Sequence, residues 1–119
     1  MKKDLMLIAG MSQHLMEVYS ALRLSKITVI HAENAYDAKA GLEMHSPAFV
    51  LLDFDIEGAN FLLNEIAFGQ HIPQPYIMIS AEYADGNDRA AMLKRGADYC
   101  TDKPINAHEV LAVIGTVLR

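Results

Sequence analysis

The chain has 119 residues and a net charge of −5, and 52% of its residues are apolar. This length fits one domain that buries most of its apolar surface, and the sequence contains no apolar run long enough to span a membrane. A single cysteine, Cys100, excludes a disulfide framework and a thiolate zinc cluster, and the acidic balance argues against direct binding of nucleic acid. Because no signal peptide is recognisable, we expect one cytoplasmic domain over residues 1–119.

Short apolar runs alternate with helical patterns along the whole chain. Runs rich in Val, Ile, Leu or Tyr predict five strands, at residues 4–9, 27–31, 49–53, 76–80 and 98–101. Polar residues that cap helices predict starts at Ser12, at Asn34 with Asp37, and at Asn106 with Glu109 as a capping-box pair. Residues 61–68 are the shortest predicted helix, and Gly96 marks the end of another.

This alternation predicts βαβ units, and hence a doubly wound α/β fold around a five-stranded parallel sheet. In such a fold the carboxyl ends of the strands lie at one edge of the sheet. That edge is expected to hold Ala9 with Gly10, Asp53, Ser80 and Lys103, which follow four different strands. We therefore predict the functional site at this edge.

Three polar side chains at the edge suit the handling of a phosphoryl group. The Asp53 carboxylate can act as a nucleophile and form an acyl phosphate. Ser80 can donate a hydrogen bond to a phosphoryl oxygen, and the Lys103 ammonium can neutralise charge on the phosphate. The alternative is a structural role for each residue: a turn cap, a partner for a backbone group, and a loop position. Their joint occurrence at three strand ends favours a site.

Over its whole length the chain resembles the receiver domain of bacterial two-component response regulators. The run Leu51-Leu52-Asp53, with Gly58 five residues later, resembles the phosphoacceptor strand, residues 77–81 resemble the strand of the switch hydroxyl, and Lys103-Pro104 resembles the end of the last strand. The resemblance implies the flavodoxin-like strand order 2-1-3-4-5 with five helices and a non-enzymatic signalling role. It also implies that Asp53 accepts phosphate from a sensor histidine kinase, and that Ser80 and Lys103 then bind it.

One departure from the family pattern concerns the metal site. The two acids that end the first strand in the family align with Ala9 and Gly10. Mg²⁺ prefers a near-octahedral set of oxygen ligands, and Asp53 and Asp55 are the carboxylates left to hold it. Asp55 is open to two interpretations, a partial replacement for the missing acids or a solvated loop residue. We predict weak or absent Mg²⁺ binding, and therefore impaired or absent Mg²⁺-dependent phosphorylation of Asp53.

A second departure lies three residues before Lys103, where the family usually has an aromatic residue that moves with the switch hydroxyl. Cys100 takes this position, and alternation along the strand turns its neighbour Tyr99 to the opposite face. We interpret Cys100 as a buried small apolar residue rather than a redox sensor. The aromatic switch of the family is therefore not expected here.

Three other hypotheses stay open. The first is an interaction module on the receiver scaffold that works without phosphorylation. The docking and dimerisation face of the family corresponds here to residues 84–95, 98–102 and 106–118. For residues 84–95, an ordinary surface helix is the competing interpretation. The second is a phosphatase of the haloacid dehalogenase superfamily, because Asp53-Phe54-Asp55 resembles its nucleophile and acid pair. The third is an anion bound by backbone amides at Gly10 and Ser12, where a helix begins.

Overall fold

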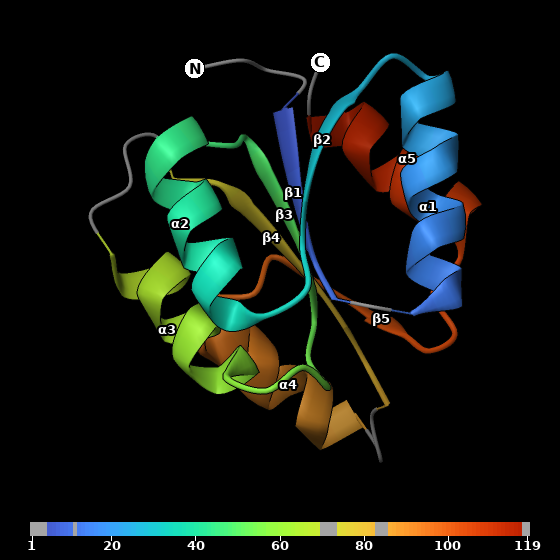
Figure 1. The fold of residues 1–119 in the computed structure, drawn as a ribbon. Helices are drawn as coiled ribbons and strands as arrows, with labels where there is room; N and C mark the ends of the chain where they lie inside the picture. Colours follow the sequence, from blue (N-terminus) through green and yellow to red (C-terminus); the bar gives the residue numbers. More distant parts are fainter. Residues whose placement is uncertain (1–4, 11, 70–73, 83–85, 118–119) are drawn as a thin grey trace.

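The computed structural model describes residues 5–10, 12–69, 74–82 and 86–117. In these residues, strands and helices alternate strictly (Figure 1). The strands are β1 (Leu5–Ala9), β2 (Thr28–Ala32), β3 (Phe49–Asp53), β4 (Tyr76–Ala81) and β5 (Tyr99–Asp102). The helices are α1 (Gln13–Leu24), α2 (Ala35–His45), α3 (Ala59–Phe68), α4 (Gly86–Lys94) and α5 (Ala107–Val117). Within the described ranges, no helix is long and apolar enough to cross a membrane.

The strands form one parallel sheet in the order β2-β1-β3-β4-β5. Helices α2, α3 and α4 cover one face of the sheet, and α1 and α5 cover the other (Figure 1). The predicted doubly wound α/β fold, with the flavodoxin-like order 2-1-3-4-5 and five helices, is therefore confirmed. This topology places the carboxyl ends of all strands at one edge of the sheet.

The sheet divides the core into two layers because side chains alternate along each strand. In β3, Val50 and Leu52 pack toward α2 and α3, whereas Phe49 and Leu51 pack toward α1 and α5. All four side chains are fully buried. A strand buried on both faces explains the continuous apolar run that ends at Asp53.

The predicted helix starts are confirmed by their capping bonds. Ser12 Oγ accepts a hydrogen bond from the Leu15 amide at 3.1 Å, and the Asn34 side chain accepts one from the Asp37 amide at 2.9 Å. Asn106 Oδ1 accepts from the Glu109 amide at 3.1 Å. The capping box is wrong in one respect, since the Glu109 carboxylate accepts hydrogen bonds from β5 side chains.

Several predicted boundaries differ from the structure. Strand β2 lies one residue later than predicted because Ala32 pairs with Ala9, and the Ala32 carbonyl accepts the Gly10 amide. Helix α3 begins two residues earlier than predicted, after Gly58 in a left-handed conformation with φ of +82°. In the described part of the chain α4, with nine residues, is therefore shorter than α3, with ten. Residue 4 of the first predicted strand, residues 84 and 85 of the fourth helix and residue 118 of the fifth lie outside the described residues.

Candidate functional site

The carboxyl edge of the sheet brings the three predicted site residues together. Asp53 ends β3 and is in register with Ser80 in β4, and Lys103 follows β5. The Lys103 ammonium lies 2.5 Å from Asp53 Oδ1. Asp53 and Ser80 are 5% and 1% exposed, and all three residues line one cleft of about 370 Å³. The geometry thus agrees with a shared site, while the role of each residue stays a prediction.

Lys103 joins two carboxylates rather than one. Its ammonium lies 2.6 Å from Asp55 Oδ2 as well, although the Asp55 side chain is 65% exposed. The Asp55 amide also donates a hydrogen bond to Asp53 Oδ1 at 3.0 Å. Asp55 is therefore not a loop acid surrounded only by solvent. Its charge is directed at the same cation as the charge of Asp53.

The electrostatic balance at Lys103 favours the charged form. Burial by itself lowers the pKa of this ammonium, but hydrogen bonds and charge attraction from Asp53 and Asp55 outweigh that effect and leave the pKa raised above 10.5. Breaking this arrangement would leave the Asp53 charge without its cation in a poorly hydrated position.

The corner between β1 and α1 is closed by backbone. The Gly10 amide donates a hydrogen bond to the Ala32 carbonyl at 2.9 Å, and the Gly10 carbonyl accepts one from His31 Nε2 at 2.6 Å. At the Gly10 φ of +154°, a Cβ atom would lie 2.6 Å from Asp53 Cβ and 2.5 Å from Leu15 Cδ1. No side chain fits at this position unless its neighbours shift.

These contacts also bear on the anion hypothesis. The Gly10 amide already donates its hydrogen bond to the Ala32 carbonyl. The hypothesis that backbone amides bind an anion here is therefore wrong for the Gly10 amide.

The donor set of the cleft does not fit Mg²⁺. Its carboxylates are Asp53 and Glu82, with Asp55 reached through Lys103. Among the residues that the structure describes, no three His, Cys, Asp or Glu side chains are grouped closely enough to hold a metal ion. Ala9 and Gly10 supply no side-chain oxygen, and an ammonium already lies against Asp53 and Asp55. Weak or absent Mg²⁺ binding stays a prediction for measurement.

The neighbours in β5 turn to opposite faces, as predicted. Cys100 packs against the core on the side of α2, α3 and α4, whereas Tyr99 packs on the side of α1 and α5. Cys100 is half-buried, so its interpretation as a buried residue is wrong in degree. The Arg89 guanidinium donates to the Cys100 carbonyl at 2.8 Å and pairs with Asp102, which fastens α4 to β5.

Two polar side chains that support the site are not among the site residues predicted from the sequence. Glu109 in α5 accepts hydrogen bonds from the Tyr99 hydroxyl, at 3.0 Å, and from Thr101, a buried residue two positions before Lys103. His31 in β2 holds the Gly10 carbonyl. The spacing of the histidines does not distinguish His31 from the others. The capping pattern predicted Asn106 as the partner of Glu109, rather than side chains of β5.

Comparisons with known proteins find similarity in sequence and in fold. No protein-family model matches the chain. The transcriptional regulatory protein KdpE of Staphylococcus aureus is 32% identical over 106 residues, which cover 89% of this chain and 45% of that protein. The chain thus spans a little under half the length of this relative.

Solved structures of similar fold cover almost the whole chain. A response regulator signal receiver domain from Bermanella marisrubri has a TM-score of 0.82 at 20% identity, with 99% of this chain and 100% of that chain covered. A response regulator receiver modulated diguanylate cyclase from Pelobacter carbinolicus has a TM-score of 0.76 at 25% identity, with 97% and 92% covered.

Proposed function

We propose that the chain, which belongs to the receiver-domain family of bacterial two-component response regulators, is a signal receiver with Asp53 as its phosphoacceptor. In this proposal, Mg²⁺-dependent phosphorylation of Asp53 is impaired or absent. The observation that carries this proposal is the contact between Lys103 and Asp53, beside Ser80 and next to a corner closed by Gly10.

The chemistry expected of Asp53 is a substitution at phosphorus. A carboxylate oxygen of Asp53 bonds to the phosphorus of the donor, the bond from phosphorus to the donor's leaving group breaks, and the leaving group takes the electron pair. Lys103 supplies positive charge next to the attacking oxygen, and the Ser80 hydroxyl is in position to donate to a phosphoryl oxygen. The charge of Lys103 and the hydrogen bond from Ser80 both come from side chains of this domain.

The reduced dependence on Mg²⁺ follows from the same contacts. A divalent ion would have to replace the ammonium between Asp53 and Asp55 and would find no carboxylate at Ala9 or Gly10. Without that ion, the approach of a dianionic donor to Asp53 is opposed by the nearby acids Asp55 and Glu82. Phosphorylation is therefore expected to be slow.

The proposal includes partners of the kind that the family uses. A sensor histidine kinase is the expected donor, and α4, β5 and α5 are the expected face for a homodimer or an effector. We assign no direct contact with nucleic acid and no membrane contact to this domain, in line with its net charge of −5. Transcription regulation is the output suggested by the similarity to KdpE, a transcriptional regulatory protein.

The phosphatase hypothesis is less well supported by the geometry. It requires the second acid of Asp53-Phe54-Asp55 to donate a proton to a leaving group. Asp55 Oδ2 instead accepts a hydrogen bond from the Lys103 ammonium at 2.6 Å, so this oxygen is already engaged within the domain. We therefore propose a non-enzymatic receiver.

The test is incubation of the chain with acetyl phosphate, with and without Mg²⁺, followed by intact mass spectrometry. A slowly formed phosphoryl adduct that is insensitive to Mg²⁺ and absent in Asp53→Asn supports the proposal. A fast adduct that requires Mg²⁺ contradicts the impairment. No adduct in either condition assigns the chain to the other hypothesis, an interaction module that works without phosphorylation. That hypothesis is favoured by Ala9 and Gly10, which supply no side-chain oxygen.

A further inference from the structure

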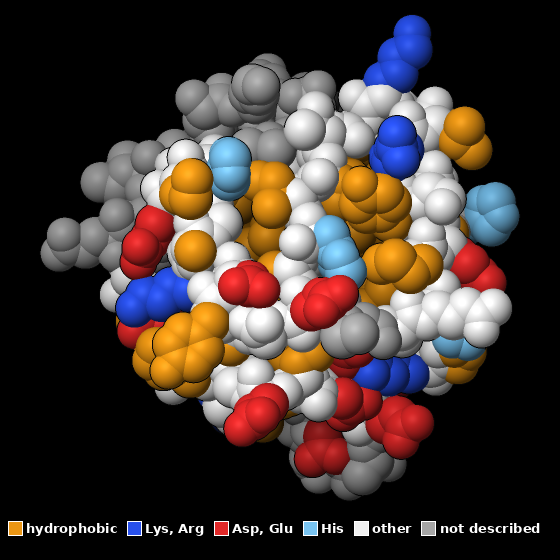
Figure 2. Space-filling view, viewed as in Figure 1, with side chains coloured by type: hydrophobic (Ala, Val, Ile, Leu, Met, Phe, Trp, Pro, Cys, Tyr) orange, Lys and Arg blue, Asp and Glu red, His pale blue; other side chains and the backbone are white. Residues whose placement is uncertain are grey.

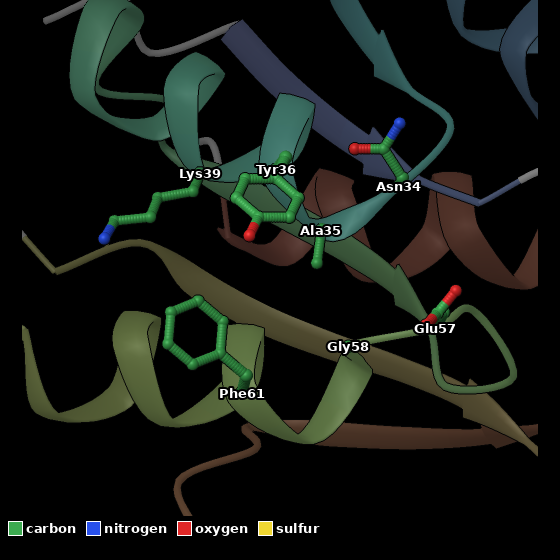
Figure 3. Close-up of a pocket in the computed structure, with 7 residues that line it drawn as sticks. All are labelled: Asn34, Ala35, Tyr36, Lys39, Glu57, Gly58 and Phe61. Carbon is green, nitrogen blue, oxygen red and sulfur yellow. The ribbon is translucent and has the colours of Figure 1, made fainter.

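A second hollow lies away from the cleft, between the N-terminal ends of α2 and α3. It has a volume of about 440 Å³, and its lining includes Ala35, Tyr36 and Lys39 from α2 and Glu57, Gly58 and Phe61 at the start of α3. Figure 3 shows Tyr36 and Phe61 on the two sides of this pocket, with Lys39 and Glu57 toward opposite ends. None of these residues belongs to the face formed by α4, β5 and α5.

The floor of the pocket is preformed. Gly58 has a φ of +82°, and a Cβ atom there would lie 2.8 Å from the Cβ of Ala35, which is itself buried. A glycine at position 58 therefore allows the starts of α2 and α3 to approach closely. Much of the lining belongs to the N-terminal parts of these two helices.

The walls of the pocket are aromatic and open to solvent. Tyr36 is 88% exposed and Phe61 is 51% exposed, and the two rings lie on opposite sides of the pocket (Figure 3). Lys39 lies 5.6 Å from the centre of the Phe61 ring and 3.9 Å from Glu65, so this cation is held at one side of the pocket. Exposed aromatic residues next to a concave surface are typical of protein contact sites.

The chain segment that forms the pocket is acidic. Seven of the fifteen Asp and Glu residues lie between positions 33 and 65, with one of the ten Lys and Arg residues, so this segment has a net charge of −6 and the rest of the chain +1. Asp53 and Asp55 belong to the cleft with Lys103. The remaining five acids lie on or beside α2 and α3: Glu33, Asp37, Glu43, Glu57 and Glu65. Figure 2 shows acidic side chains on both sides of exposed apolar groups in this region.

We propose that the pocket between α2 and α3 binds a partner protein through a basic amphipathic segment, with an apolar side chain placed between Tyr36 and Phe61 and Lys or Arg side chains against the surrounding acids. The apolar walls supply the anchor, and the acidic rim selects the charge of the partner. A second copy of the chain fits less well, because it would place the same acidic face against this one. This surface is independent of the chemistry proposed for Asp53.

The experiment is a titration of the ¹⁵N-labelled chain with a synthetic amphipathic helical peptide that has a leucine and tryptophan face and lysine at its other positions. A second peptide has glutamate at each lysine position. We expect saturable amide shifts at residues 35–39 and 57–61 with the lysine peptide, and none with the glutamate peptide. Added salt should weaken the binding.

Variants then separate the pocket from general attraction between opposite charges. Phe61→Ala and Tyr36→Ala should each weaken binding by about tenfold, because each removes one wall of the pocket. The matched control is Leu24→Ala, since Leu24 is 87% exposed at the end of α1 on the other side of the sheet. That control should leave the affinity unchanged, and all four proteins should give the same dispersed spectrum of a folded domain.

Three results would overturn the proposal. These are equal binding of the glutamate peptide, equal affinity of Phe61→Ala and the Leu24→Ala control, and shifts of the same amides on dilution of the chain alone. The third result would assign the pocket to a second copy of the chain. Peptide binding is also measured in Asp53→Asn, which cannot form the phosphoryl adduct. Because the pocket is independent of Asp53, this variant should bind the lysine peptide as the wild type does, so the peptide test can succeed or fail separately from the phosphorylation test.

Discussion

The two halves of the carboxyl edge of the sheet differ in what their residues are free to do. At the ends of β3, β4 and β5, Asp53, Ser80 and Lys103 direct polar side chains into a cleft. At the ends of β1 and β2, the backbone of Gly10 is bonded on both sides, to the Ala32 carbonyl and to the His31 ring. The half at β3, β4 and β5 presents polar side chains to the cleft. In the half at β1 and β2, the backbone groups of Gly10 form hydrogen bonds within the domain.

This difference indicates that the missing acids at positions 9 and 10 are not simply deleted from an otherwise receptive site. Gly10 approaches Asp53 and Leu15 so closely that no Cβ fits. The positive charge of Lys103 is shared by Asp53 and Asp55. The closed corner and the ion pairs of Lys103 are the two features on which the proposal of weak Mg²⁺ binding rests.

Gly10→Asp is the change with the largest expected effect, because it forces a carboxylate into the closed corner. Its Cβ would meet Asp53 Cβ at 2.6 Å, and its charge would lie next to that of Asp53. We expect a loss of about 3 kcal/mol in the free energy of unfolding, measured by urea denaturation. Calorimetry should find no gain in Mg²⁺ binding.

The matched control is Gly115→Ala in α5, where a Cβ would meet nothing within 4 Å. That substitution should be neutral or stabilise the domain by up to about 1 kcal/mol, because alanine is the better helix former. Tight Mg²⁺ binding in a stable Gly10→Asp variant would contradict the view that the corner is closed.

Residues that end strands were predictable, whereas the contacts between loops were not. Asp53, Ser80 and Lys103 follow apolar runs, and parallel strands must bring such positions to one edge. The partner of Asp55 depends on where a long flexible lysine side chain comes to rest 48 positions later. No periodicity in the sequence carries that information.

The same limit applies to Gly10 and Glu109. A glycine where the family pattern predicts an acid indicates a lost ligand, but the sequence does not reveal how closely Gly10 approaches Asp53 and Leu15. Glu109 lies three residues after a helix cap, where a local hydrogen bond is the usual expectation. The nearby hydroxyls of Tyr99 and Thr101 in β5 take that carboxylate instead.

Lys103→Met tests the open half of the edge and should have the second largest effect. It leaves the buried Asp53 carboxylate without its cation, at nearly constant side-chain volume. We expect a loss of about 2 kcal/mol in the free energy of unfolding at neutral pH. Asp55→Asn is the control, and because the Asp55 side chain is 65% exposed its effect should be below about 0.5 kcal/mol. Equal losses in the two variants would show that burial of Asp53 is unimportant.

The same variant provides a test of pH dependence. Because the pKa of Lys103 is raised in the folded state, its contribution to stability is complete below about pH 10.5 and is lost as the pH rises through the raised value. The pKa values of Tyr76 and Tyr99 are also raised, so their titration likewise lowers the free energy of unfolding as the pH rises. The wild type should therefore lose more stability than Lys103→Met above that pH. Parallel curves would remove Lys103 from this dependence.

His31→Ala tests the closed half of the edge and should have the smallest effect. It removes the hydrogen bond to the Gly10 carbonyl and the edge-on contact with Tyr19, whose ring centre lies 6.3 Å from that of His31. We expect a loss of about 1 kcal/mol in the free energy of unfolding, together with faster hydrogen exchange at the Gly10 amide. His45→Ala, at an exposed position at the end of α2, should change neither quantity. If exchange at Gly10 stays slow without His31, the bond from its amide to Ala32 holds the corner alone, and the closure belongs to the β1–β2 pairing rather than to the histidine.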